Sequence, residues 1–241
     1  MEKAKIRLCV TQALAQGQTI PLDRDQSNYL FGVMRLKSAA RVLLFNGVDD
    51  EYLAEVTVAN KRNGMLMCLE KVRPLQMPPD LWLLFAPIKK ARTDFIVEKA
   101  AEMGAARIMP VQTRFTNSER IRQDRLQAHA LEAAEQCGGT YVPEVTDIRK
   151  LDAVLADWPA DRQLVFCDET LVDAKTVLAT QSDVQKWALL IGPEGGFSDE
   201  ERVQLSSLPF VTKISLGPRI LRADTAAVAA LTLWQSTLGD W

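Results

Sequence analysis

Two glycine-bearing turns, close together in the C-terminal third, constrain the fold of this chain more than any other feature. The first turn, IGPEGGF, spans residues 191–197, and the second, SLGPRILRADTA, spans residues 215–226. Each turn follows a short apolar run and precedes a helical pattern, which predicts two strand–loop–helix units. Glycine lacks a Cβ atom, so the main chain can approach a ligand closely at these turns. The doubled pattern predicts a binding site between two loops, although tight connections alone would also explain the glycines.

The residues around the first turn narrow the choice of ligand. Neither the dinucleotide motif GxGxxG nor the phosphate-binding motif GxxxxGK[ST] occurs in the chain. The turn carries Glu194 and leads into an acidic helix start, in which Ser198 and Glu201 have the spacing of a capping box. Acidic side chains at a helix start disfavour a bound phosphate. They are compatible with a ligand that has a cationic centre, such as a sulfonium.

The composition is that of a globular protein. The chain has 241 residues, of which 47% are hydrophobic and 25% charged, enough for one large domain or two modest ones. Four scattered cysteines and a single histidine argue against a disulfide framework or a zinc site. No apolar run approaches the roughly 20 residues that span a bilayer. We therefore expect a cytoplasmic protein without a metal ion or a membrane-spanning segment.

Charge and proline content suggest two domains. The net charge is −2, but residues 1–73 hold eleven Lys and Arg against eight Asp and Glu, which leaves the remainder acidic. A basic first part that faces RNA and chance variation on solvated surfaces would both produce this difference. Three prolines lie between residues 73 and 80, where neither a helix nor a central strand continues easily. We expect a first domain at 1–73, a linker at 74–80 and a second domain at 81–241.

Hydrophobic periodicity predicts a different architecture for each domain. In the first, short strands are expected at residues 5–10, 41–45, 51–59 and 65–72 around one helical segment at 25–35, which is typical of a small β-barrel. In the second, apolar strands alternate with amphipathic helices, which predicts a mainly parallel sheet covered on both faces. Ligands of such sheets bind outside the carboxyl ends of the strands, and both glycine turns fall there.

The glycine turns and several other segments resemble a known family. IGPEGGFSDEE followed by SLGPRILRADTA is similar to the C-terminal signature of the ribosomal RNA small-subunit methyltransferase E family, in the SPOUT class of knotted S-adenosylmethionine enzymes. The resemblance extends to DFIVEKAAEMGA, PVQTRF, EAAEQCGGTYVPEV and, in the N-terminal third, YLFGVMRLKSAARVLLFNG. It covers nearly the whole chain.

This resemblance implies a fold and an activity. The expected fold is α/β, with a trefoil-knotted, mainly parallel sheet bearing helices on both faces, preceded by a small PUA-like β-barrel domain that binds RNA. Topology rules argue against a knot, which only the resemblance supports. The expected activity is methylation of uracil N3 in 16S ribosomal RNA, as free RNA or in the assembled small subunit, with S-adenosylmethionine as cofactor. A SPOUT enzyme acting on another RNA, such as tRNA, and a noncatalytic RNA-binding factor stay open as alternatives.

For the cofactor, the resemblance implies a pocket between the two glycine turns. From composition alone, the glycines would be assigned to turns and the leucines and isoleucines to the core. The residues expected to contact S-adenosylmethionine are Ile191, Gly192, Pro193, Gly195, Gly196, Leu216, Gly217, Arg219, Ile220, Leu221 and Thr225.

The expected catalytic residues are Arg222 and Glu194. Arg219 and Arg222 lie in a short loop flanked by apolar residues, which suggests that an anion is nearby. We expect Arg222 to face the uracil and to stabilise the negative charge that develops when N3 loses its proton. Ion pairs of the arginines with Asp224 or Glu194 are the structural alternative, and helix capping is the alternative for Glu194. His129 is expected to be structural.

The expected RNA contacts are basic side chains of the second domain. They are Lys89, Lys90, Arg92 and Arg114, with Arg120, Arg122 and Arg125 as further candidates. Solvated surface charge is the alternative interpretation. Two positions depart from the family pattern: Asp224 stands where Glu is usual, and Gly139 stands where Arg is usual, which removes one expected phosphate contact.

The closing helix, residues 224–238, points to self-association. It has no charged residue between Asp224 and Asp240, and its apolar or small residues surround most of the helix. Such a helix is expected to be covered on two sides. Burial in its own domain would explain this pattern. The resemblance instead implies a C2 homodimer with Trp234 at or beside the interface.

Overall fold

The structure divides the chain into two compact units. The computed structural model describes residues 4–117, 121–167, 178 and 183–241. One unit comprises Met1–Met77 together with Ala134–Val142, and the other comprises Pro78–Ala133 together with Pro143–Trp241. The division expected from the prolines was a single cut, whereas in the structure the short segment Ala134–Val142 packs with the N-terminal residues.

The first unit is a mixed five-stranded sheet with one short helical segment. β1 pairs with β3 in parallel, all other strand pairs are antiparallel, and the strand order is β1-β3-β4-β5-β2. The elements are β1 (Arg7–Cys9), β2 (Thr19–Pro21), α1 (Arg24–Asn28), the π-helical turn η1 (Tyr29–Val33), β3 (Arg41–Phe45), β4 (Glu51–Val58) and β5 (Met65–Arg73). β2 was not expected, because three residues that include a proline carry no strand signal; a proline is tolerated there because β2 is an edge strand.

A buried carboxylate attaches the segment Ala134–Val142 to this sheet. Glu51 is 2% exposed and forms ion pairs of 2.7 Å with Arg7 and 2.6 Å with Arg73. Arg7 donates hydrogen bonds to the carbonyl oxygens of Ala134 and Gly139, each at 2.7 Å, and Arg73 donates one to the carbonyl of Gly138. The two guanidinium groups thereby donate to carbonyl groups at and just beyond a helix end, where the helix itself supplies few backbone donors.

The second unit is built on a parallel sheet. The strand order is β12-β10-β11-β6-β7-β8, β9 pairs with β7, and every pair is parallel. The strands are β6 (Leu81–Phe85), β7 (Arg107–Gln112), β8 (Glu144–Val145), β9 (Arg149–Lys150), β10 (Gln163–Cys167), β11 (Trp187–Ile191) and β12 (Val211–Ile214).

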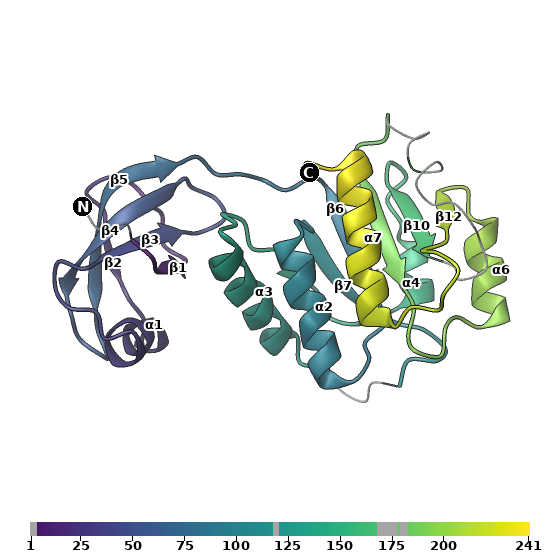
Figure 1. Ribbon diagram of the computed structural model, residues 1–241, viewed down its shortest axis with the longest axis horizontal. Helices are drawn as coiled ribbons and strands as arrows, with labels where there is room; N and C mark the ends of the chain where they lie inside the picture. The colour runs from purple at the N-terminus through teal and green to yellow at the C-terminus, as the bar shows by residue number, and fades with distance from the viewer. Residues whose placement is uncertain (1–3, 118–120, 168–177, 179–182) are drawn as a thin grey trace. The chain divides into compact units, whose positions relative to one another are not determined.

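Helices cover both faces of this sheet, as the alternating apolar pattern predicts. Along β6, Leu83 and Phe85 face one core, whereas Leu84 faces the other. α2 and α7 lie side by side on the first face (Figure 1) and pack against each other. The described helices of this unit are α2 (Lys90–Glu102), α3 (Gln123–Cys137, whose last turn belongs to the first unit), α4 (Leu151–Ala156), α6 (Asp199–Ser207) and α7 (Ala223–Leu238).

The connections that follow two neighbouring strands lie on opposite faces of the sheet. β6 and β11 are neighbours, but α2, which follows β6, and α6, which follows β11, contribute to opposite cores. In open parallel sheets, ligands bind outside the carboxyl ends of the strands near such a change of face. Residues 168–177 and 179–182, between β10 and β11, lie outside the described part of the chain, and the described strand order and pairings do not show the expected knot. The knot therefore stays a prediction.

Trp234, expected at or beside a dimer interface, lies inside its own unit. It is 2% exposed and belongs to the core formed by β6, β11, α2 and α7. Burial within its own domain, the alternative stated above, accounts for the apolar character of Trp234.

In the part of the chain that the structure describes, no helix is long and apolar enough to cross a membrane. The described residues also contain no group of three or more His, Cys, Asp or Glu that could hold a metal ion.

Candidate active site

A pocket opens at the carboxyl ends of β10, β11 and β12, where the sequence placed the ligand. Both glycine turns contribute to its wall. Eight of the eleven residues expected to contact the cofactor line this pocket: Ile191, Gly192, Pro193, Gly196, Leu216, Gly217, Arg219 and Leu221. Five further lining residues were not expected: Cys167, Phe197, Arg202, Ala223 and Ala226.

Contacts and backbone conformation within the first turn explain why glycine stands at two of its positions. A Cβ on Gly192 would lie 2.6 Å from the ring of Phe197, so this ring packs where a side chain would stand. Gly196 has a φ of +71°, a backbone conformation that favours glycine, and its N–H donates a 2.9 Å hydrogen bond to Pro193 O. These glycines both shape the turn and line the pocket.

The helix start after the first turn is capped by the predicted pair. Ser198 Oγ accepts a hydrogen bond of 3.2 Å from the N–H of Glu201, and Glu201 Oε2 accepts one of 2.9 Å from the N–H of Ser198. The other carboxylate oxygen of Glu201 accepts a 2.8 Å hydrogen bond from the N–H of Arg114. The capping box is confirmed, and it fastens the loop after β7 to the start of α6.

The second turn is more open. Gly217 has a φ of +115°, is exposed, and has no atom within 4 Å of the position that a Cβ would occupy. Within this turn, the hydroxyl of Ser215 accepts a weak hydrogen bond of 3.3 Å from Gly217 N–H. The space in front of this backbone is therefore free for a ligand.

Arg92 holds the two carboxylates that were considered as partners for Arg219 and Arg222. Arg92 Nη1 lies 2.7 Å from Glu194 Oε1, and Arg92 Nε lies 3.6 Å from Asp224 Oδ2. Arg92 stands in the first turn of α2, Glu194 in the first glycine turn and Asp224 in the first turn of α7. One guanidinium thus connects three elements around the pocket.

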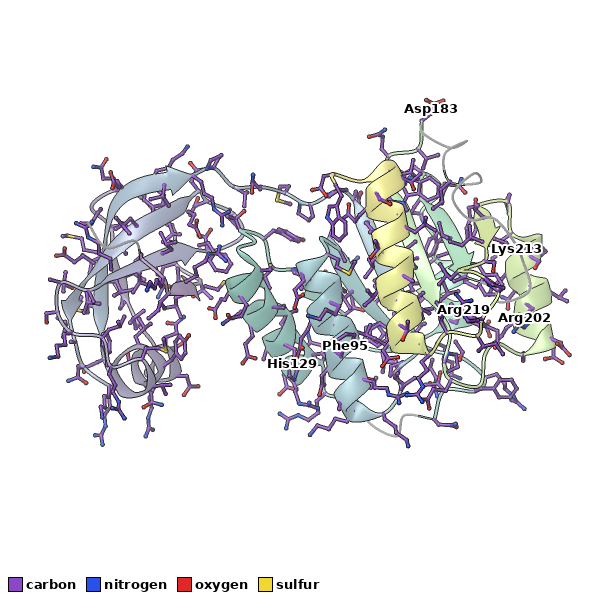
Figure 2. All side chains as sticks on the ribbon, viewed as in Figure 1. Phe95, His129, Asp183, Arg202, Lys213 and Arg219 are labelled. Carbon is purple, nitrogen blue, oxygen red and sulfur yellow. The ribbon has the colours of Figure 1, made fainter. Side chains whose placement is uncertain are left out.

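The two arginines of the second turn form no ion pair with any residue that the structure describes. Arg222 is exposed and occupies the N-cap position of α7, where its carbonyl oxygen accepts a 2.7 Å hydrogen bond from Ala226 N–H and its side chain makes no capping contact. Arg219 is exposed and lines the pocket; Figure 2 shows it with Arg202 in the region between the start of α7 and α6. Two cationic groups therefore stand at the site without a carboxylate partner among the described residues.

Four of the expected site residues lie beside the pocket without lining it, in addition to Arg222. Glu194 is exposed and paired with Arg92, and Thr225 is exposed in the first turn of α7. Ile220, expected to face the adenosyl group, is 83% exposed. Gly195 lies against Phe115, because a Cβ there would be 3.3 Å from Phe115 Cβ.

The candidate RNA contacts differ in their surroundings. Lys89, Lys90 and Arg114 are exposed, and Arg92 is engaged as described. Arg122 pairs with Asp124 at 2.5 Å. Arg125 pairs with Asp94, and Arg120 lies outside the described residues. His129 lies 2.9 Å from Glu98 at the α2–α3 contact, an environment that suits a structural residue.

The five lining residues that were not predicted lie at positions where the local sequence gives little indication of ligand binding. Phe197 and Arg202 follow the first glycine turn, and the Nε of Arg202 donates a 3.3 Å hydrogen bond to the carbonyl of Phe197. Ala223 and Ala226 are one turn apart on α7, where small side chains leave space. Cys167 ends an apolar strand; burial raises the pKa of its thiol to about 12, so the thiol stays protonated although part of its surface faces the pocket.

Comparison with known proteins identifies the family. A family model described as an RNA methyltransferase domain matches residues 76–235, more than half of the chain, and a model described as an RNA methyltransferase PUA domain matches residues 22–64. The chain is 28% identical over 228 residues to the ribosomal RNA small subunit methyltransferase E of Rickettsia conorii, covering 93% of each chain.

Two solved structures are similar over essentially the whole chain. A methyltransferase from Legionella pneumophila in complex with the cofactor SAM superposes with a TM-score of 0.90 at 27% identity, covering 100% of both chains. Ribosomal RNA small subunit methyltransferase E from Neisseria gonorrhoeae, bound to S-adenosyl methionine, superposes with a TM-score of 0.89 at 26% identity, covering 98% of this chain and 99% of that one. The expected fold, a parallel α/β unit preceded by a PUA-like domain, is confirmed. The chain belongs to the RNA methyltransferase family, and its resemblance to the ribosomal RNA small-subunit methyltransferases E is confirmed.

Proposed function

We propose that this protein transfers a methyl group from S-adenosylmethionine to N3 of a uracil in 16S ribosomal RNA. The observation that carries the proposal is the pocket between the two glycine turns, with Arg219 and Arg222 exposed at its side and not paired with any described carboxylate. The relatives named ribosomal RNA small subunit methyltransferase E, and the two similar structures that hold S-adenosylmethionine, support methylation of small-subunit ribosomal RNA with this cofactor.

The residues of the pocket fit S-adenosylmethionine. Leu216, Leu221 and Ala226 offer an apolar wall for an adenine ring, and the open space beside Gly217 admits a ligand against bare backbone. Arg202 and Arg219 supply positive charge for the carboxylate of the methionine part. When bound, S-adenosylmethionine supplies an electrophilic methyl group on a sulfonium.

Arg222 has the chemistry that a uracil substrate requires. The N3 of uracil carries an imide proton and is a poor nucleophile until that proton leaves. The negative charge then spreads to the flanking carbonyl oxygens, where a fixed guanidinium stabilises it. The proton goes to water, so the reaction needs no strong base from the protein. Arg222 is suited to this role because it is exposed and at the N-cap position of α7, beside the pocket residue Ala223.

Basic side chains near the pocket would hold the RNA backbone. Lys89 and Lys90 are exposed at the start of α2, and the first turn of α2 has no acidic residue. Arg114 is exposed on the loop that Glu201 fastens to α6. Phosphate contacts position the substrate and weaken with salt, whereas the target base must leave its stack to reach the methyl donor.

The experiment that tests the proposal compares 16S ribosomal RNA from cells with and without this protein. A methyl group on N3 blocks base pairing, so reverse transcription should stop at one uridine in RNA from normal cells and read through in RNA from cells lacking the protein. Adding purified protein and S-adenosylmethionine to the unmodified small subunit or its free RNA should restore the stop and identify which of the two is the substrate. An unchanged 16S pattern together with a methyl group lost from tRNA would reject the proposal.

We also propose that the protein is a C2 homodimer. The solvent-facing side of α7 carries uncharged residues, among them Thr225, Ala229, Thr232 and Ser236, at spacings of three and four residues. A helix side without charge is suited to close packing against a second copy. Sedimentation equilibrium at micromolar concentration should give twice the 26.9 kDa of one chain. A fully active monomer would contradict the proposal.

A further inference from the structure

Arg92, beside the pocket, is engaged by two carboxylates, those of Glu194 and Asp224. We propose that Arg92 is a positioning residue, which holds the two walls of the cofactor pocket together, and that it does not contact RNA phosphate. This inference rests on the proposed function in one respect only, namely that the pocket binds S-adenosylmethionine.

The guanidinium of Arg92 projects from a fixed part of the backbone. Arg92 N–H donates a 2.9 Å hydrogen bond to Lys89 O at the start of α2. The hydroxyl of Thr93 accepts a hydrogen bond from Ile88 N–H and donates one to Ile88 O, both at 3.0 Å, and Ile88 and Thr93 are buried. The backbone that carries Arg92 is therefore tied to the buried segment that joins β6 to α2, which limits where its side chain can reach.

Each carboxylate that Arg92 binds belongs to a different wall of the pocket. Glu194 lies between Pro193 and Gly196, which line the pocket and are joined by a hydrogen bond of 2.9 Å. Asp224 lies between Ala223 and Ala226, which line the pocket from α7. Because both carboxylates approach the same guanidinium, loss of Arg92 would leave two negative charges facing each other and would allow the walls to separate.

The local charge argues against a phosphate contact. Arg92 with its two carboxylates has a net charge of −1, so the group repels a phosphate, whereas Lys89 and Lys90 are exposed nearby and form no ion pair with a described residue. The exposed fractions of the Arg92, Glu194 and Asp224 side chains are 31%, 47% and 21%. Ion pairs of this exposure are individually weak, so we expect an effect on affinity of about fivefold rather than a complete loss of binding.

The test separates cofactor affinity from RNA affinity. Calorimetric titration with S-adenosylmethionine should show about fivefold weaker binding for Arg92→Ala than for the wild-type protein. Lys99→Ala is the matched control, because it removes the Lys99–Glu102 ion pair from the same helix without touching the pocket, and its affinity should be unchanged. Melting temperatures of both variants report whether the unit is folded.

Binding of the unmodified 16S RNA at several salt concentrations distinguishes positioning from a phosphate contact. Removing a phosphate contact lowers the salt slope by about 1. Lys90→Ala should show this lower slope, whereas Arg92→Ala should keep the wild-type slope. An Arg92→Ala protein with wild-type cofactor affinity and a reduced salt slope would overturn the inference.

A substitution at Asp224 provides a second test, in which affinity for S-adenosylmethionine is expected to be kept or increased. The 3.6 Å separation of Arg92 Nε and Asp224 Oδ2 is longer than a hydrogen bond. A side chain longer by one methylene group would reach the guanidinium, so Asp224→Glu should bind S-adenosylmethionine at least as tightly as wild type. Asp224→Asn should weaken binding, and in combination with Arg92→Ala it should add little. Fully additive losses would show that the two residues act separately.

The role of Arg92 and the proposed function can fail independently. If the variants show the expected affinities for S-adenosylmethionine but the wild-type protein does not methylate uracil, the proposed function is rejected and the role of Arg92 stays intact.

Discussion

The two glycine turns line the same pocket, yet they are held in different ways. Residues 192–198 are fixed by their own contacts: the ring of Phe197 packs where a Cβ of Gly192 would stand, Gly196 closes a turn, and Ser198 caps α6. Residues 215–222 have few contacts of this kind, and both of their arginines are exposed. One turn is therefore shaped by folding, whereas the other leaves space and charge available to ligands.

The largest expected effect comes from the open turn. Arg222→Ala should lower kcat for methylation by about 10² to 10³, because it removes the proposed donor for the charge that develops on the base. Its affinity for S-adenosylmethionine should stay near that of the wild-type protein. Single-turnover methylation assays and calorimetry measure the two quantities, with Lys213→Ala, an exposed lysine on β12, as the control. A variant that methylates at the wild-type rate would show that Arg222 is structural.

The next effect tests the turn that is shaped by folding. In Gly192→Ala the new methyl group would collide with the Phe197 ring at 2.6 Å, and overpacking of this kind costs about 1–3 kcal/mol. Thermal unfolding should therefore occur at a lower temperature, by about 2–4 °C for each kcal/mol. An unchanged melting temperature would show that the Phe197 ring moves without cost, and the contrast between the turns would be lost.

Gly217→Ala is the counterpart in the open turn. A side chain at a φ of +115° is strained by about 1–3 kcal/mol, but nothing surrounds the new methyl group, so the exposed turn can relax without unfolding the sheet. The melting temperature should change little, and affinity for S-adenosylmethionine should fall about tenfold, which corresponds to about 1.4 kcal/mol. A large drop in melting temperature with unchanged affinity would reverse the roles assigned to the two turns.

The smallest effect concerns the helix cap. Ser198→Ala removes the hydrogen bond to Glu201 N–H and should lower stability by about 1 kcal/mol, measured by denaturant unfolding. Ser206→Ala, at an exposed position inside α6, is the control and should stay within about 0.5 kcal/mol of wild type. Equal stability of the two variants would mean that the capping box contributes little to the first turn.

Local patterns of the sequence determined the alternation of strands and helices in the second unit, the parallel sheet and the position of the pocket. Alternating apolar residues define strands buried on both faces, and the spacing of Ser198 and Glu201 defines a capping box, because both patterns involve neighbours in the chain. The resemblance then indicated eight of the residues that line the pocket.

The tertiary structure alone decided which distant side chains meet. Arg92 and Glu194 are 102 positions apart, and Arg7 and Gly139 are 132 positions apart, so no local pattern links them. Packing also left Ile220 exposed and buried Trp234 within its own unit, although both carry the same apolar signal in the sequence. The reason is physical: periodicity reports which face of an element is apolar, whereas charge pairing and exposure depend on how the elements pack.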